Sequence, residues 1–166
     1  MENLLVWIGL GIVGLAVLGF VLISFSLSPR QQVTRVELVK APIADVWEAL
    51  SNLPTQAYWR SGLKSIQMLD DDAGLRWVEH PEHGSPVTVR KLKEKPQQEL
   101  VLEMIGHGDY GTRQVRFSNV PGGTRLTFTD VLETRSPFAR VKARSGGGLD
   151  KKLDTFIQQL RQKFSS

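Results

Sequence analysis

The sequence predicts an α+β protein: one membrane-spanning helix, then a single domain whose seven-stranded antiparallel sheet wraps around a long C-terminal helix. Three observations predict this class. Residues 4–27 contain no charged side chain in 24 positions. Six strand-like segments follow one another later in the chain at roughly ten-residue spacing. The chain closes on an apolar stripe at helical spacing. We therefore expect an anchor at residues 1–29 and one domain at residues 30–166.

The apolar segment at residues 4–27 is long enough to cross a bilayer, because a helix of this length spans about 36 Å. The alternative is a cleaved signal peptide, which has basic residues before a shorter apolar run. Met1–Asn3 carries no basic residue, which favours the uncleaved anchor. Arg30, Arg35 and Lys40 follow the segment. By the positive-inside rule, these charges predict that the domain lies on the cytoplasmic side.

The domain is expected to begin with a strand at Val33–Lys40, where β-branched residues are frequent. Pro42 then suits the first position of a helix. A second short helix is expected at Thr55–Arg60, ending before Gly62. The first of these helices carries one apolar stripe, made of Ile43, Val46, Trp47 and Leu50.

Six further strands are expected between turn-forming Gly, Pro and Asp residues. Short loops join them, and strands joined in this way form an antiparallel meander. The predicted strands are Leu63–Leu69, Leu75–His80, Val87–Lys93, Glu99–Ile105, Thr112–Asn119 and Thr124–Glu133.

The chain is expected to end in a helix that Ser136 caps and that has Pro137 in its first turn. Glycines 146–148 interrupt or kink this helix, because glycine is a poor helix former. The remainder carries an apolar stripe that can cover one face of the sheet. Its residues are Leu149, Leu153, Phe156, Ile157, Leu160 and Phe164.

Three passages resemble a known superfamily: VTRVELVKAPIADVWEALSNLPTQAYW, GGTRLTFTDVLE and SPFARVKARSGGGLDKKLDTFIQQLRQKF. With the order of elements, the resemblance covers about residues 33–164 and points to the START-like, or Bet v 1-like (SRPBCC), superfamily of polyketide cyclase/dehydrase and lipid-transport proteins. The resemblance implies a helix-grip fold that encloses a hydrophobic cavity. It also implies an apolar ligand such as a lipid, sterol, quinone or aromatic polyketide. The fold hosts binders, transporters and enzymes alike, so the resemblance names no single activity.

The candidate ligand-binding residues follow from this implied cavity. Glu79, Arg113 and Asp130 fall in phase with apolar residues of their strands, so they could orient a ligand in an apolar pocket. The alternatives are that they lie at strand ends in water, or that they pair with one another. Six further residues are expected to line the cavity or simply to pack in the core. They are Trp47, Trp77, Met104, Phe117, Phe128 and Phe156.

The basic excess of the chain lies in its last segment. Residues 30–134 contain 13 basic and 14 acidic side chains, whereas residues 135–166 contain 8 basic and 2 acidic ones. A basic cluster on a tethered domain is attracted to anionic lipid and would dock the cavity mouth on the bilayer. The alternative is a solvated helix face. The predicted membrane-surface residues are Arg140, Lys142, Arg144, Lys151 and Lys152.

Several classes of chemistry are not expected. The chain has no cysteine, which excludes disulfides, thiolate metal sites and a cysteine nucleophile. His80 and His83, three residues apart in a loop, are weak evidence for a metal site, and no element fixes His107 nearby, so we expect no metal; nothing indicates a cofactor. The patterns GxSxG, HExxH and the phosphate loop are absent from the sequence. Nucleic-acid binding is not expected either, because no recognised module is present.

The sequence thus favours membrane-anchored binding or transport of a hydrophobic small molecule, such as a lipid or quinone. A first alternative is an enzyme of the cyclase/dehydrase type acting on an aromatic polyketide, which would use Glu79 or Asp130 as its acid or base. A second alternative is a membrane-bound scaffold for a protein partner. A filled interior would favour the scaffold, and a co-purifying ligand would favour the binder.

Overall fold

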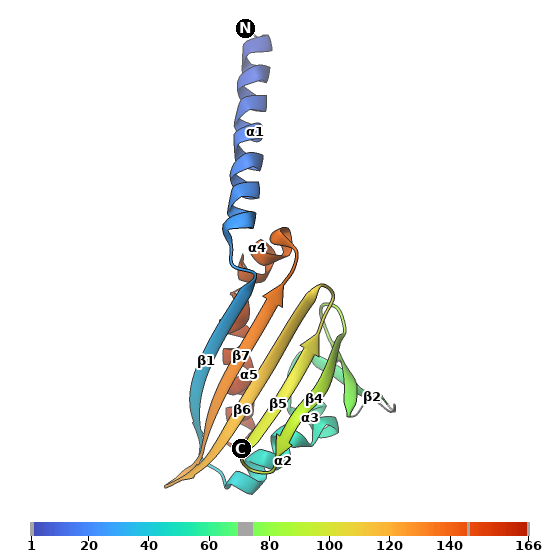
Figure 1. Ribbon diagram of the computed structural model, residues 1–166, viewed down its shortest axis with the longest axis vertical. Coiled ribbons are helices and arrows are strands. Elements are labelled where there is room, and N and C mark those ends of the chain that lie inside the picture. The colour runs from blue at the N-terminus through green and yellow to red at the C-terminus, as the bar shows by residue number, and fades with distance from the viewer. Residues whose placement is uncertain (1, 70–74, 146, 166) are drawn as a thin grey trace.

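The computed structural model describes residues 2–69, 75–145 and 147–165. Figure 1 shows α1 standing away from a curved sheet, with α5 running along one face of that sheet. The order of elements is α1 (Glu2–Ser26), β1 (Arg30–Val39), α2 (Ile43–Ser51), α3 (Leu53–Trp59), β2 (Leu63–Leu69), β3 (Arg76–Pro81), β4 (Val87–Lys95), β5 (Glu99–Ile105), β6 (Asp109–Val120), β7 (Gly123–Thr134), α4 (Pro137–Ser145) and α5 (Gly148–Lys163).

The seven strands form one antiparallel sheet in the order β1-β7-β6-β5-β4-β3-β2. This confirms the predicted meander, to which β1 adds an edge next to β7. The bounds of β2 and β5 agree with the prediction, while β1 and β6 each begin three residues earlier than expected. The reason is that backbone pairing continues past the β-branched residues: Arg30 pairs with Glu133, and Asp109 pairs with Thr134.

A tight turn joins β6 to β7 and requires glycine. Gly123 has a φ of +148°, and a Cβ atom there would lie 2.1 Å from the carbonyl oxygen of Val39. The end of β1 therefore approaches this hairpin more closely than any side chain permits. Next to it, the Thr124 hydroxyl donates a hydrogen bond of 2.9 Å to the carbonyl of Ala41. These contacts fix the start of the segment that leads into α2.

The helices α2 and α3 lie at the far end of the sheet from α1 (Figure 1). Pro42 is the residue before α2 rather than its first helical residue, a shift of one position from the prediction. The α2 stripe is confirmed in part, because Val46 and Leu50 are buried while Trp47 is half-buried. α3 begins two residues earlier than expected, at Leu53, since proline is tolerated in the first turn of a helix.

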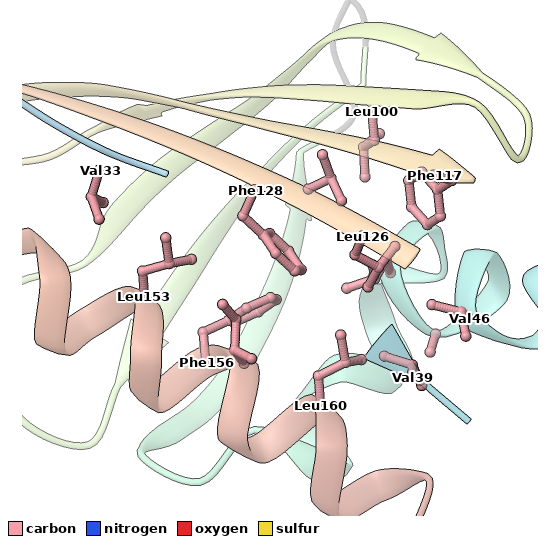
Figure 2. Packing of buried hydrophobic residues seen from close by; sticks show 14 of the residues in the cluster. Val33, Val39, Val46, Leu100, Phe117, Leu126, Phe128, Leu153, Phe156 and Leu160 are labelled. Carbon is pink, nitrogen blue, oxygen red and sulfur yellow. The ribbon is translucent and has the colours of Figure 1, made fainter. Parts of the chain in front are cut away.

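The core lies between α5 and the sheet. Figure 2 shows Leu153, Phe156 and Leu160 of α5 directed towards Leu126 and Phe128 of β7. The predicted α5 stripe is confirmed by five buried residues, Leu149, Leu153, Phe156, Ile157 and Leu160. The glycine-rich break is confirmed as well: α4 ends at Ser145, and Gly147, with a φ of +88°, precedes α5. Gly146 lies outside the described residues.

The end of α1 contacts α4. The rings of Phe20 in α1 and Phe138 in α4 stack with their centroids 5.9 Å apart. α1 also contains a 21-residue span, Val6–Ser26, which is long and apolar enough to cross a membrane. Most of its large apolar side chains, from Val6 to Phe25, are exposed in the structure.

Two arginines of α4 hold the junction between α1 and β1. The Arg140 guanidinium donates hydrogen bonds to the carbonyls of Leu27, Thr134 and Arg135, at 3.0–3.2 Å. Arg144 donates one of 3.1 Å to the carbonyl of Ser28. These carbonyls belong to the segment after α1 and to the end of β7 and the residue after it, so the two guanidinium groups join α1 to the domain.

Candidate ligand-binding cavity

An inner pocket of about 270 Å³ lies between α5 and the sheet. Seven apolar side chains from α2, β4, β5, β6 and α5 line it, together with a few polar groups. Of the nine predicted ligand-binding residues, the structure places Glu79, Met104, Arg113 and Phe156 in this lining. The apolar part of the lining consists of Leu50, Val89, Leu100, Leu102, Met104, Val115 and Phe156.

The other five predicted residues lie away from the pocket lining. Trp77, Phe128 and Asp130 are almost fully buried, with exposed fractions of 0–1 %. Phe117 packs edge-on against Trp47 with ring centroids 5.1 Å apart. The four aromatic residues among these five therefore pack in the core. Core packing was the alternative to lining the cavity that the sequence left open for them. Asp130 lies behind Arg113 rather than in the lining itself.

An outer pocket of about 390 Å³ adjoins the inner one. Its lining includes residues 60–63, the end of β3, the start of β4 and the first turns of α5. Both pockets share Arg60, Glu79, Lys152 and Phe156, so these four residues stand where the mouth meets the interior. Among the sequence-predicted membrane-surface residues, Lys151 and Lys152 thus lie at the mouth of the cavity.

The register of the sheet shows where the strand residues of the outer pocket lie relative to α1, which stands at one end of the sheet (Figure 1). A row of directly paired residues crosses five strands from the start of β1: Arg30, Glu133, Tyr110, Ile105 and Thr88. The next residue before Thr88 is Val87, which lines the outer pocket and pairs with Glu79. Because α1 ends shortly before Arg30, the outer-pocket residues of β3 and β4 lie at the end of the sheet to which α1 is attached, while its other lining residues follow α3 or belong to α5.

Arg60 holds Glu79 at the base of the mouth. Two guanidinium nitrogens of Arg60 donate to the two carboxylate oxygens of Glu79, at 2.8 and 2.9 Å. Both side chains are only 18 % exposed. Burial raises the pKa of the Glu79 carboxyl. The hydrogen bonds and charge of Arg60, the Trp77 indole N–H and the charge of Arg113 together outweigh burial and lower this pKa below its ordinary value.

The sequence reasoning missed Arg60. This residue follows the end of α3, outside any apolar stripe, so neither helical nor strand periodicity marks it. Only the packing of α3 against β2 and β3 brings the guanidinium to Glu79.

Arg113 and Asp130 form a second buried ion pair on neighbouring strands. They are direct partners in the β6–β7 register, and Arg113 donates to both carboxylate oxygens of Asp130, at 2.7–3.2 Å. The exposed fractions of the two side chains are 13 % and 1 %. The sequence left open whether the three ionisable residues would pair with one another. Arg113 and Asp130 do so, whereas Glu79 pairs with Arg60.

Phe156 lies between the two arginines. The Arg113 guanidinium carbon is 4.2 Å from the centre of the Phe156 ring, and that of Arg60 is 5.3 Å away. The same ring makes an edge-on contact with Phe128 and a tilted contact with Trp59. The negative face of an aromatic ring attracts a cation, so Phe156 helps to hold both guanidinium groups in the apolar interior.

We expect the Arg60–Glu79 pair to make stability depend on acidity. The folded state lowers the Glu79 pKa, so the pair stabilises the protein fully above the ordinary value of 4.5, and this stabilisation is lost as the pH falls through the lowered pKa. In thermal unfolding of the full chain in detergent, the difference in stability between wild type and Glu79→Gln should therefore be largest at neutral pH. The difference in stability should narrow as the pH falls below 4.5 and through the lowered pKa of Glu79. A difference that stays constant with pH would contradict this assignment.

The structure gives the remaining predicted surface residues other surroundings. Arg140 and Arg144 bind carbonyls of the junction with α1, and Lys142 lies between them in sequence on α4. Within residues 2–69, 75–145 and 147–165, no group of three His, Asp or Glu side chains could hold a metal ion.

The sequence model of one protein family, described as polyketide cyclase / dehydrase and lipid transport, matches residues 30–164. The chain belongs to this family. No curated protein sequence matches the chain. As a member of the polyketide cyclase/dehydrase and lipid transport family, it has the helix-grip arrangement of sheet and C-terminal helix that its sequence predicts.

Solved structures of several proteins share the fold of this family member. The ZhuI aromatase/cyclase from Streptomyces sp. R1128 is similar with a TM-score of 0.70 at 14 % identity, over 82 % of this chain and 94 % of that one. A conserved protein from Geobacillus kaustophilus is similar with a TM-score of 0.67 at 16 % identity, over 81 % of this chain and 95 % of that one. An uncharacterised protein from Rhizobium leguminosarum is similar with a TM-score of 0.65 at 18 % identity, over 82 % of this chain and 95 % of that one. At these identities, the similarity establishes the fold alone.

Proposed function

We propose that this protein binds a hydrophobic small molecule, such as a lipid or quinone, in the cavity between α5 and the sheet, while residues 1–29 anchor the domain of residues 30–166 to a membrane. The observation that carries the proposal is the position of the outer-pocket residues of β3 and β4 at the end of the sheet to which α1 is attached. A ligand dissolved in the membrane would then reach the cavity without crossing bulk water. The family description and the apolar lining support the same conclusion.

Membrane contact is part of this proposal. α1 provides the apolar span, and α4 lies against its end with basic residues in its last turn. Basic side chains near a bilayer surface attract anionic lipid head groups, and Arg30 at the start of the domain favours the cytoplasmic side. Both features hold the mouth close to the membrane.

A cyclase-type activity is the second candidate, because the family description and one similar structure name it. Its acid or base would have to be Glu79 or Asp130. Both oxygens of each carboxylate accept hydrogen bonds from an arginine. A carboxylate held in this way is a weak proton acceptor, so the arrangement favours binding over catalysis.

We expect the full chain, purified from the membrane fraction, to carry one hydrophobic molecule that native mass spectrometry and solvent extraction detect. Leu102→Trp should lower its occupancy at least about tenfold, because the larger side chain occupies the inner pocket. The matched control is Ile105→Trp on the same strand, where the side chain is 47 % exposed, and it should retain the ligand.

Three outcomes would count against the proposal in different ways. A full chain found only in the soluble fraction would contradict the anchor. Equal occupancy in Leu102→Trp and Ile105→Trp would place the ligand outside the inner pocket. An empty wild-type chain that binds no lipid or quinone offered to it would favour the scaffold for a protein partner.

A further inference from the structure

We propose that the ligand is an anionic amphiphile, with a carboxylate or phosphate head group bound at the mouth by Lys152 and an apolar chain in the inner pocket. This inference rests on the proposed function and adds the chemical class of the ligand.

The charges around the two pockets do not balance. Four basic residues line them, and the acidic residue in the lining is Glu79. Asp130 adds a second negative charge behind Arg113. Each carboxylate is paired with one arginine, so Arg60 and Arg113 are neutralised. The remaining pair, Lys151 and Lys152, have no carboxylate partner in the lining of the pockets.

Nearby acidic residues offset only part of the charge of the two lysines, because two carboxylates share one guanidinium and keep a single negative charge. Asp150 and Asp154, on the same turns of α5, bind Arg35 of β1 at 2.9 and 2.8 Å. Within the described part of the chain, neither Lys151 nor Lys152 has an acidic partner, and both are exposed. The mouth of the cavity therefore carries a net positive charge that an anion can satisfy.

The position of the lysines within α5 is electrostatically unfavourable. The helix begins at Gly148, so Lys151 and Lys152 lie at its positive N-terminal end, where acidic residues are preferred. Asp150 in the first turn offsets part of this effect, but it is shared with Arg35. Proteins keep such unfavourable charge placements mainly where function requires them. A bound anion would convert both charges into favourable contacts.

Lys152 is the lysine that connects the mouth to the interior. It lines both pockets, together with Arg60 and Phe156, whereas Lys151 lines the outer pocket. Beyond Lys152 the lining becomes apolar with Leu102 and Met104. A head group at Lys152 would thus place an attached chain directly against these side chains. The amphiphile would enter the pocket with its apolar chain first, and its head group would stay at the mouth.

The test uses the full chain in nanodiscs of phosphatidylcholine, with its three methionines labelled at the methyl carbon. The Met104 methyl group reports on the inner pocket, and Met68 on β2, 41 % exposed and outside both linings, serves as internal reference. Dodecanoate and dodecanol are titrated as probes that share a chain and differ in head-group charge. The inner pocket lies near the lower end of the ~300–1,000 Å³ range of ligand pockets, which suits a chain of this medium length.

We expect both probes to shift the Met104 resonance. Lys152→Gln should weaken the binding of dodecanoate at least about tenfold and leave the binding of dodecanol unchanged, because only the carboxylate loses an ionic partner. Lys152→Arg should retain dodecanoate binding. Lys64→Gln removes the same charge from an exposed site on β2 outside both pockets, so it should alter neither titration.

The outcomes separate this inference from the proposed function. If Lys152→Gln weakens the binding of both probes equally, or of neither, the assignment of the head group to Lys152 is overturned. The proposal of an apolar ligand-binding cavity is then unaffected. If neither probe shifts Met104 in the wild-type chain, the proposed function fails, and the anionic ligand fails with it.

Discussion

Asp130→Asn lowers the free energy of unfolding by about 3–5 kcal/mol, the loss expected when one partner of a buried ion pair is removed. The amide keeps the shape of the side chain but leaves the Arg113 guanidinium, 13 % exposed, without its counter-charge. Thermal or denaturant unfolding of the full chain in detergent measures this loss. The matched control is Asp154→Asn. Its partner Arg35 is 37 % exposed and Asp154 itself 55 %, so it should cost only about 0–1 kcal/mol.

A double variant distinguishes the pairing from other roles of Asp130. Replacing both partners, as in Arg113→Met with Asp130→Leu, removes the uncompensated charge together with its partner. Such replacements are often neutral or stabilising. We expect the double variant to be more stable than Asp130→Asn. If Asp130→Asn costs no more than Asp154→Asn, the pair is not a structural element of the cavity wall.

Phe156→Ala should cost about 3–5 kcal/mol of unfolding free energy, in the range of phenylalanine truncations in protein cores. The change removes the contacts with Phe128 and Trp59 and the ring face beneath Arg113. It also enlarges the space that both pockets share. The same unfolding experiment measures the loss, with Tyr58→Ala as the aromatic control. Tyr58 is 90 % exposed, so its truncation should change stability by about 0.5 kcal/mol or less.

A second readout separates packing from ligand binding at this position. Phe156→Leu fills more of the space than alanine and should lose less stability, yet it lacks the ring on which both guanidinium groups rest. We therefore expect lower ligand occupancy in Phe156→Leu even where the fold is retained. A Phe156→Ala variant as stable as Tyr58→Ala would show that the ring does not hold the cavity together.

Local patterns determined much of the fold. Gly, Pro and Asp residues punctuate the strands, so β2 and β5 were predicted with their observed bounds. The spacing of apolar residues predicted the buried face of α5, and strand alternation placed Glu79 and Arg113 on the face that lines the cavity. These features depend on neighbours a few residues apart, whose geometry the backbone periodicity fixes.

Tertiary structure decided the partners. Arg60 reaches Glu79 only because α3 packs beside β2 and β3. The Arg140 guanidinium, which its charge alone predicts to lie near lipid, donates a hydrogen bond to the carbonyl of Leu27, 113 residues away in sequence. Such contacts depend on the order of strands in the sheet and on how the helices lie across it, which no local periodicity encodes. The sequence by itself therefore determined the elements and their buried faces. Only the folded chain decided which charges are neutralised and which remain at the mouth of the cavity.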